Sequence, residues 1–268
     1  MKVSLIISTY NRPDALRLCL LSAFAQSRVP DEIIVGDDGS RDDTRKLIEE
    51  MRKDCPTKLI HVWQEDKGFR LAMMRNKSVA ASTGEYIIEV DGDVILHCDY
   101  VKDHLHFAER GYYLKGGRTN LGKRLTEKLC EKGELVPIHW WTRGIESKPE
   151  NSIHLPGVAE YLALRYRRKR EGALGCNMSF FRDDYMKLNG YDEFYEGWGG
   201  EDGDFGRRLQ MSGLTKKHLK FAGIVYHLWH EDKYMQNKQL NFDHSIRPDI
   251  KVRCDNGIDK YLTDSTEK

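Results

Sequence analysis

The chain has 268 residues, of which 43 are basic and 42 acidic, so its formal net charge is +1. This length is sufficient for one large domain or two small ones with a substantial hydrophobic core. The balanced charge gives no global argument for nucleic-acid binding, and we expect no nucleic-acid partner.

The six cysteines are scattered and include no CxxC pair, which argues against a disulfide framework or a zinc knuckle and favours a reducing compartment. No apolar run is long enough to span a bilayer. A strand predicted to begin at Lys2 leaves no room for a signal peptide. We therefore expect a cytoplasmic protein, with peripheral contact at the inner face of the cell membrane as a further option.

The first ninety residues alternate short apolar runs with helical patterns. Strands are predicted at Val3–Ser8, Asp31–Gly36, Lys58–Gln64 and Glu85–Val90, and helices at Pro13–Phe24, Asp42–Arg52 and Phe69–Ala81. Such alternation predicts an α/β fold with a mostly parallel sheet and helices on both faces.

Polar loops follow three of these strands: Ser8–Arg12, Asp37–Ser40 and Asp91–Asp93. In open parallel sheets, ligands bind beyond the carboxyl ends of the strands. We therefore expect the three loops to converge on one edge of the sheet.

The middle of the chain, from about Lys115 to Gly172, is irregular and basic and ends in the run Arg165–Arg170. This run suits a solvated helix face, an anionic acceptor or an anionic membrane surface, where each basic residue contributes about 1 kcal/mol. Strands are expected again near Gly175–Phe181 and Ile224–Tyr226.

We divide the chain into a first half (1–110), a variable basic insertion (111–172), a second half (173–246) and a C-terminal tail (247–268). All are expected to belong to one continuous domain. The tail is polar and is expected to pack loosely.

The stretch NGYDEFYEGWGGEDGD, residues 189–204, has an unusual composition. Three glycines surround Trp198, and Glu201 and Asp202 follow them directly. Clustered glycines indicate an unusual backbone or a close approach to another group, whereas acids at this position also suit a helix N-terminus. The two interpretations are compatible, because a carboxylate at a helix start is held rigidly.

Two further patterns suit a metal ion. Asp91 and Asp93 follow a buried strand, where alternate carboxylates hold a hard divalent cation, although Asp and Gly are also ordinary turn residues. His227 and His230 lie three apart after another strand, and imidazole combined with carboxylate suits Mn²⁺, with Mg²⁺ as the second choice.

Other polar side chains suit a nucleotide. A carboxylate of the loop after the second strand, such as Asp38, can accept hydrogen bonds from a base or a ribose, or can serve only the turn. Arg70 and Arg75 can pair with phosphate or belong to a solvated helix face.

These residues lie in recognisable runs. VSLIISTYNRPDAL, EIIVGDDGS and GEYIIEVDGD resemble the nucleotide-sugar-binding half of family 2 glycosyltransferases, which have the GT-A fold. NGYDEFYEGWGGEDGDFGRRL and the HLWH that follows resemble the β-1,4-galactosyltransferase family and bacterial chondroitin-type polymerases. Together the resemblance covers residues 2–110 and 172–232.

The resemblance implies a metal site and a donor site. Asp93 matches the direct metal ligand of the family's Asp-x-Asp motif, with Asp91 as its partner on the donor, and His230 matches the histidine that completes the metal site. At His227 galactosyltransferases often carry methionine, so its ligation stays open. The uridine-binding positions are matched by Ser8, Tyr10, Arg12 and Asp38.

The resemblance also implies the catalytic groups. Asp202 matches the catalytic base, Glu201 the neighbouring acid that helps to hold the acceptor, and Trp198 the tryptophan of a mobile substrate loop. Gly203 stands where galactosyltransferases have another Asp, which leaves the base in place but puts acceptor specificity in doubt.

The function implied is inverting transfer of a sugar, with galactose or N-acetylgalactosamine favoured, from a UDP-sugar to a carbohydrate or lipid-linked glycan acceptor in surface polysaccharide or glycolipid synthesis. One alternative is a nucleotidyltransferase, although no Gly-rich, Lys/Arg-bearing triphosphate loop follows the first strand. The other is a catalytically dead carbohydrate-binding subunit, which would need no base.

Overall fold

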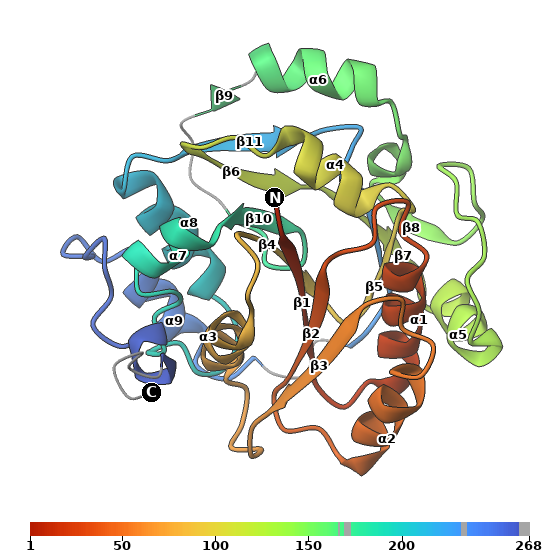
Figure 1. The fold of residues 1–268 in the computed structure, drawn as a ribbon, viewed down its shortest axis with the longest axis horizontal. Helices are drawn as coiled ribbons and strands as arrows, with labels where there is room; N and C mark the ends of the chain where they lie inside the picture. Colours follow the sequence, from red (N-terminus) through yellow and green to blue (C-terminus); the bar gives the residue numbers. More distant parts are fainter. Residues whose placement is uncertain (166, 169–172, 232–234, 263–268) are drawn as a thin grey trace.

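The computed structural model describes residues 1–165, 167–168, 173–231 and 235–262. Two sheets form its centre, and helices cover the larger sheet on both faces (Figure 1). The prediction of an α/β fold with a mostly parallel sheet is confirmed, and its physical basis lies in the first four strands.

These four strands pair in parallel in the order β3-β2-β1-β4. They are β1 (Val3–Thr9), β2 (Glu32–Asp37), β3 (Lys58–Trp63) and β4 (Tyr86–Asp91), connected by α1 (Pro13–Phe24), α2 (Asp42–Met51) and α3 (Leu71–Ala81). Every residue of β1 and β2 is buried, as the continuous apolar runs predict for strands covered on both faces.

Successive residues of β1 serve two different cores, because side chains alternate across a strand. Leu5 and Ile7 pack with α1 and α2, whereas Ile6 packs with α3 and with Phe205 of α8 (Glu201–Met211). The second core therefore joins the parallel strands to the helix that carries Glu201 and Asp202.

The larger sheet continues past β4 with strands from the second half of the chain. β10 (Met178–Phe181) pairs antiparallel with both β4 and β6 (Tyr112–Gly116), β11 (Thr215–Leu219) is parallel to β6, and β9 (Arg167–Arg168) closes the edge. The side chains of the basic run Arg165–Arg170 lie outside the described residues.

A second, smaller sheet was not predicted. Its order is β5-β12-β7-β8, from β5 (Val94–Leu96), β12 (Val225–His227), β7 (Arg118–Leu121) and β8 (Ile145–Ser147). Strands of three or four residues are too short for a clear period-two pattern, and three of them follow polar or glycine-rich sequence.

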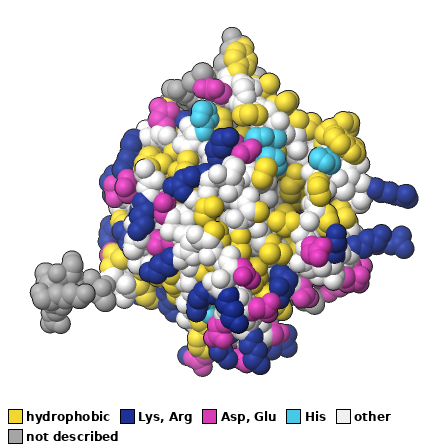
Figure 2. Space-filling view, turned by 45° about the vertical axis from the view of Figure 1, so that its right-hand side comes forward, with side chains coloured by type: hydrophobic (Ala, Val, Ile, Leu, Met, Phe, Trp, Pro, Cys, Tyr) yellow, Lys and Arg dark blue, Asp and Glu magenta, His cyan; other side chains and the backbone are white. Residues whose placement is uncertain are grey.

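The remaining helices surround these sheets. They are α4 (Tyr100–Phe107), α5 (Lys123–Lys132), η1 (Pro149–Ser152), α6 (Pro156–Arg165), α7 (Arg182–Lys187), α9 (Lys238–Ser245) and η2 (Ile258–Tyr261). Over the described ranges, no helix combines the length and the apolar composition that crossing a bilayer requires. On the face shown in Figure 2, basic and acidic side chains are intermixed.

The C-terminal segment packs against the body, so the prediction of a loose tail was wrong for the residues described. Ile258 is fully buried in the second core, and its N–H donates to Asn189 O at 2.9 Å. Cys254 is also buried, and its N–H donates to Leu188 O at 3.1 Å. Ile250 is buried as well, so isolated apolar residues anchor this polar stretch, and a composition argument misses them.

Candidate active site

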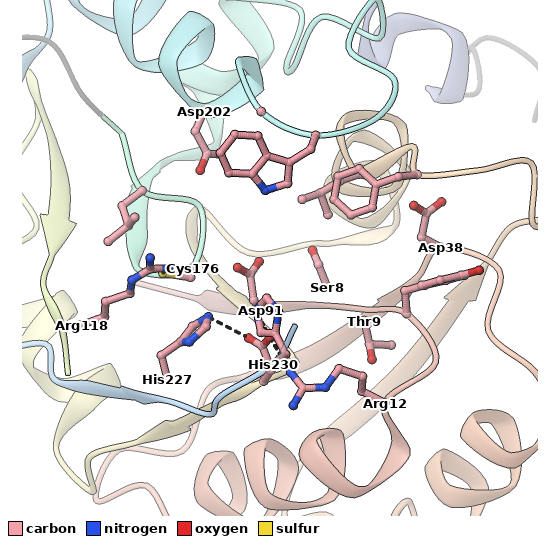
Figure 3. Close-up of a pocket in the computed structure, with 18 of the residues that line it drawn as sticks. Ser8, Thr9, Arg12, Asp38, Asp91, Arg118, Cys176, Asp202, His227 and His230 are labelled. Atoms are coloured by element: carbon pink, nitrogen blue, oxygen red, sulfur yellow. Dashed lines mark hydrogen bonds and ion pairs between the residues drawn. The ribbon is translucent and has the colours of Figure 1, made fainter. Parts of the chain in front are cut away.

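A cleft of about 1070 Å³ opens where β1, β2 and β4 end (Figure 3). The loops Ser8–Arg12 and Asp91–Asp93 line it together with Asp38, so the structure brings the three polar loops together. The opposite wall comes from Trp198–Asp202, and the floor includes His227 and His230. Twelve of the thirteen residues expected to serve donor, metal or catalysis line this cleft, and Arg70 does not.

Asp93, His227 and His230 form a compact cluster in the cleft. Their candidate ligand atoms lie within 4.8 Å of one another. His227 Nε2 is 3.6 Å from Asp93 Oδ1, and His230 Nε2 is 3.4 Å from Asp93 Oδ2. Burial lowers the pKa of His227, which keeps its ring neutral and its lone pair available for a cation.

The cluster is assembled by the small sheet. β12 pairs antiparallel with β5, which places His227 opposite Val94, and Leu228 N–H donates to Asp93 O at 2.9 Å. Main-chain hydrogen bonds therefore fix the separation of Asp93 from His227. His230 follows in the loop after the strand and is more exposed.

The donor set fits a divalent cation. Asp93 Oδ1 is buried and has no hydrogen-bond partner among the described residues, a costly condition that a bound cation would relieve. Arg12 contacts the other oxygen: its Nη1 is 2.8 Å from Asp93 Oδ2, and its Nη2 donates to Trp229 O at 3.1 Å. Arg12, expected at the uridine, thus lies at the carboxylate of the cluster.

Asp202 is held by two donors on the opposite wall. Arg75 Nη1 donates to its Oδ1 and Gly175 N–H to its Oδ2, both at 2.7 Å. Arg75 Nη2 also reaches Asp91 Oδ1 at 3.3 Å. Arg75 is 1% exposed and engaged by two carboxylates, so it connects the walls of the cleft and is not free for phosphate.

Glu201 precedes Asp202 at the start of α8 and is buried. Burial, with a further contribution from the neighbouring Asp202 charge, raises the pKa of Glu201 to about 7. Near neutral pH its carboxyl is therefore protonated in part of the molecules and can donate or accept a hydrogen bond.

Trp198 lies in a loop whose glycines adopt positive φ: 78° at Gly197, 84° at Gly199 and 94° at Gly200. The Trp198 side chain is 42% exposed and lines the cleft. The loop backbone is held from outside, since Trp198 N–H donates to Gln236 O at 3.0 Å and the Asn241 side chain of α9 donates to Trp198 O at 3.3 Å. In this structure the loop therefore rests on the segment around α9.

The two acids after β2 differ in their surroundings. Asp37 accepts from Ser40 N–H at 2.8 Å and lies 3.0 Å from His61 Nε2, contacts that stabilise the turn. Asp38 lines the cleft, and burial raises its pKa to about 6 despite the Arg70 N–H that donates to it at 2.7 Å. Arg70 contributes this backbone donor, while its guanidinium reaches Glu65 O.

Ser8 and Tyr10 follow the same first strand but differ in their contacts. Ser8 is buried at the end of β1, at the base of the cleft. Tyr10 lines the cleft, and its hydroxyl donates to Asp66 Oδ2 at 2.9 Å.

Sequence reasoning missed the wall formed by β7 and β8. Arg118, Asn120, Glu146 and Ser147 line the cleft from these strands. Arg118 makes no ion pair with any described residue, and its Nη1 lies 3.9 Å from Cys176 Sγ. Only the concentration of basic residues after Lys115 indicated a role for this segment.

Comparison with known families places this cleft in context. Residues 4–182, more than half of the chain, match the model of glycosyl transferase family 2. The chain belongs to glycosyl transferase family 2. Residues 157–231, which include Trp198–Asp202 and both histidines of the cluster, match a model described as the N-terminal domain of galactosyltransferase.

Relatives cover nearly all of the chain. Validoxylamine A glucosyltransferase of Streptomyces hygroscopicus subsp. limoneus is 27% identical over 91% of this chain and 56% of its own length. Chondroitin synthase of Escherichia coli is 24% identical over 84% of this chain and 34% of its own length. The chain thus spans about half of the first relative and a third of the second.

The fold also occurs in solved structures. The structure of S. aureus TarS 1–349 in complex with UDP-GlcNAc superposes with a TM-score of 0.54 at 18% identity, covering 88% of this chain and 60% of that one. At this identity the likeness shows a shared fold.

Proposed function

We propose that this chain transfers a hexose from a UDP-sugar to a hydroxyl group of a carbohydrate acceptor, with inversion and with help from a divalent metal ion. The observation that carries the proposal is that a candidate metal site and an oriented carboxylate face each other across one cleft. Asp93, His227 and His230 form a cation cluster on one side, and Asp202 is an oriented carboxylate on the other. A binding subunit needs neither.

The family membership supports glycosyl transfer over nucleotidyl transfer. The TarS structure, which shares this fold, is described in complex with UDP-GlcNAc, and the relative from Escherichia coli is named chondroitin synthase. These names support a UDP-sugar donor and a glycan acceptor for this chain as parts of the proposal.

The donor would lie along the ends of β1 and β4. Asp38 is positioned to accept hydrogen bonds from the base or ribose, beside Ser8 and Tyr10. Arg118 projects into the cleft without a carboxylate partner among the described residues, and we assign it to the diphosphate in place of Arg70 and Arg75.

The metal would be Mn²⁺, or Mg²⁺, held by Asp93 and His230 with His227 beside them, because imidazole with carboxylate suits manganese better than oxygen ligands alone. When bound, such an ion neutralises charge that develops on a leaving diphosphate. Arg12, now on Asp93 Oδ2, supplies a positive charge at the same place.

Asp202 would act as the base. Its carboxylate takes the proton of the acceptor hydroxyl while the acceptor oxygen bonds to the anomeric carbon and the bond from that carbon to the UDP oxygen breaks. Attack from the face opposite to UDP inverts the anomeric centre. Arg75 and Gly175 N–H orient the carboxylate, and Glu201 beside it can bind another acceptor hydroxyl.

Trp198 would cover the donor and exclude water, which limits hydrolysis. The match over residues 157–231 favours galactose or N-acetylgalactosamine as the sugar. The acceptor that we propose is a carbohydrate or lipid-linked glycan of surface polysaccharide or glycolipid synthesis, with peripheral membrane contact through Arg165–Arg170.

The experiment that tests this proposal measures UDP release from a panel of UDP-sugars with Mn²⁺, with and without EDTA. Asp93→Ala is the test variant, and Asp183→Ala, at an exposed acid that does not line the cleft, is the matched control. We expect slow release from one donor above the others, abolished by EDTA and by Asp93→Ala but retained in Asp183→Ala. Absence of UDP release from every donor, together with no UDP binding by calorimetry, would contradict the proposal. Release of pyrophosphate from a nucleoside triphosphate would instead indicate a nucleotidyltransferase.

A further inference from the structure

Three side chains outside the cleft converge where β5 ends and α4 begins. His97 follows β5, Asp99 occupies the N-cap of α4, and His154 lies between η1 and α6. Each offers one ligand atom, and these atoms lie within 4.8 Å of one another. Asp93 precedes β5 and His97 follows it, so about 13 Å of extended chain separates this cluster from the cation cluster of the cleft.

The two imidazoles face each other with ring centroids 4.4 Å apart and planes inclined by 36°. Burial and the neighbouring His154 lower the pKa of His97, so this ring is neutral near pH 7 and carries a lone pair. Nδ1 of His97 accepts a hydrogen bond from Asp99 N–H at 3.2 Å. Cys98 Sγ lies 3.9 Å from the same nitrogen, so metal ligation by His97 would replace only long contacts.

His154 is oriented by a buried carboxylate. Its Nε2 lies 3.0 and 3.2 Å from the two oxygens of Asp103, which is 5% exposed and accepts Gly223 N–H at 2.9 Å. A carboxylate that accepts the N–H of one ring nitrogen directs the lone pair of the other outward. This is the usual outer partner of a metal-binding histidine.

Asp99 completes the donor set. Ser27 Oγ donates to its Oδ1 at 2.6 Å, and Lys102 Nζ approaches the same oxygen at 3.6 Å, so Oδ2 remains for a cation. The side chains of Asp99 and His154 are 25% and 20% exposed, which leaves a path for an ion to enter.

We propose that His97, Asp99 and His154 bind one Zn²⁺ ion, with water as the fourth ligand. Two imidazoles and one carboxylate are typical zinc ligands, whereas Mg²⁺ and Ca²⁺ prefer oxygen donors. The ion would tie the segment between η1 and α6 to the start of α4. Because the cluster lies outside the cleft, we expect this link to be independent of sugar transfer.

The test uses an Asp93→Ala background, which removes the central ligand of the cleft cluster. After EDTA treatment and dialysis, Zn²⁺ is titrated in competition with a chromophoric chelator. We expect one equivalent to bind, with affinity more than about 100-fold weaker after Asp99→Asn or His154→Ala, because loss of an orienting partner alone costs about 10–100-fold. In Asp103→Asn, which loses only the orienting partner of His154, zinc affinity should fall by about 10–100-fold.

Two matched controls define the site. His106→Ala removes an exposed histidine of α4 that lies outside the cluster and should leave zinc affinity unchanged. Cys98→Ser removes an exposed thiol whose Sγ is 3.9 Å from His97 Nδ1, and should also leave it unchanged. A large loss in Cys98→Ser with none in His154→Ala would overturn the assignment.

A second readout does not require the Asp99 and His154 variants to fold, because it uses the Asp93→Ala protein alone. In the Asp93→Ala protein, one equivalent of Co²⁺ should give the intense visible absorption of a tetrahedral site. Zn²⁺ should displace it and slow cleavage by a glutamyl endopeptidase after Glu150, which is exposed in η1. The absence of stoichiometric zinc binding in Asp93→Ala would refute the proposal, as would binding that survives both Asp99→Asn and His154→Ala.

Discussion

Arg75 illustrates how one buried side chain organises the cleft. Its guanidinium bridges Asp202 and Asp91 and stacks over the Tyr191 ring at 5.0 Å. Gly175 leaves room for it, because a Cβ there would lie 2.0 Å from Arg75 Nη2. The carboxylate proposed as the base is therefore aimed by a residue on another helix and by a glycine that permits the approach.

Asp202→Asn tests the base directly. The amide retains a carbonyl oxygen for Arg75 or for Gly175 N–H, but it cannot take a proton, so transfer should fall by about 10²–10⁴-fold. UDP and metal binding, measured by calorimetry, should stay close to the wild-type values. Asp243→Asn, on the exposed side of α9, provides the control. Transfer at the wild-type rate in Asp202→Asn would remove the residue from the mechanism.

Contiguous sequence motifs point to candidate site residues such as Asp93 and His230, which follow strands, and Asp202, which follows a glycine-rich loop. The sequence does not predict which arginine contacts the Asp202 carboxylate, which contacts Asp93, and which is left to face the cleft. Arg75 meets Asp202 across 127 residues of chain, and Arg118 lies on a strand of only four residues. Such partnerships arise from tertiary packing, for which local patterns carry no signal.

Among the elements, the start of α8 depends on backbone freedom. Gly200 has φ of 94°, and a Cβ there would lie 2.7 Å from Asn241 O and 2.8 Å from the Tyr195 ring. Gly203 lies inside the same helix, and nothing within 4 Å would meet its Cβ. The backbone therefore requires glycine at position 200, whereas position 203 has room for a side chain.

We expect Gly200→Ala to lower the free energy of unfolding by about 1–3 kcal/mol, because alanine is strained at positive φ and meets backbone. Gly203→Ala should raise it by about 0.5–1 kcal/mol, because alanine is preferred inside helices. Urea denaturation followed by circular dichroism measures both. Equal midpoints for the two variants would show that the loop before α8 relaxes freely.

The elements themselves were predictable where hydrophobic runs were long. The boundaries of β1, α1 and β2 fall within one residue of expectation, because each run is continuous and is ended by polar or proline-containing sequence. The third helix begins at Leu71 and not at Phe69, since Asp38 captures Arg70 N–H in a non-helical conformation. Of the small sheet, only β12 was predicted, at Ile224–Tyr226, because the other three strands lack a comparable apolar run.

Over the whole molecule, the C-terminal segment stabilises the second core. Ile258 is fully buried beside α3 and the aromatic cluster around Phe205. Ile258→Ala should therefore cost about 2–5 kcal/mol of unfolding free energy. Val252→Ala, at a side chain 36% exposed in the same segment, should change it by no more than about 0.5 kcal/mol. Similar midpoints for the two variants in urea would show that this segment detaches before the core unfolds.

The position of β10 has a consequence for the growing chain. This strand, made late, pairs with β4, which is completed in the first third of the sequence (Figure 1). Until residue 181 leaves the ribosome, the four parallel strands present an apolar edge with unpaired N–H and C=O groups. Such edges recruit strands from other chains, and nascent N-terminal segments tend to fold first. Successful synthesis therefore depends on shielding that edge while the middle segment is translated, and chaperone supply should limit the yield of this protein more than its final stability does.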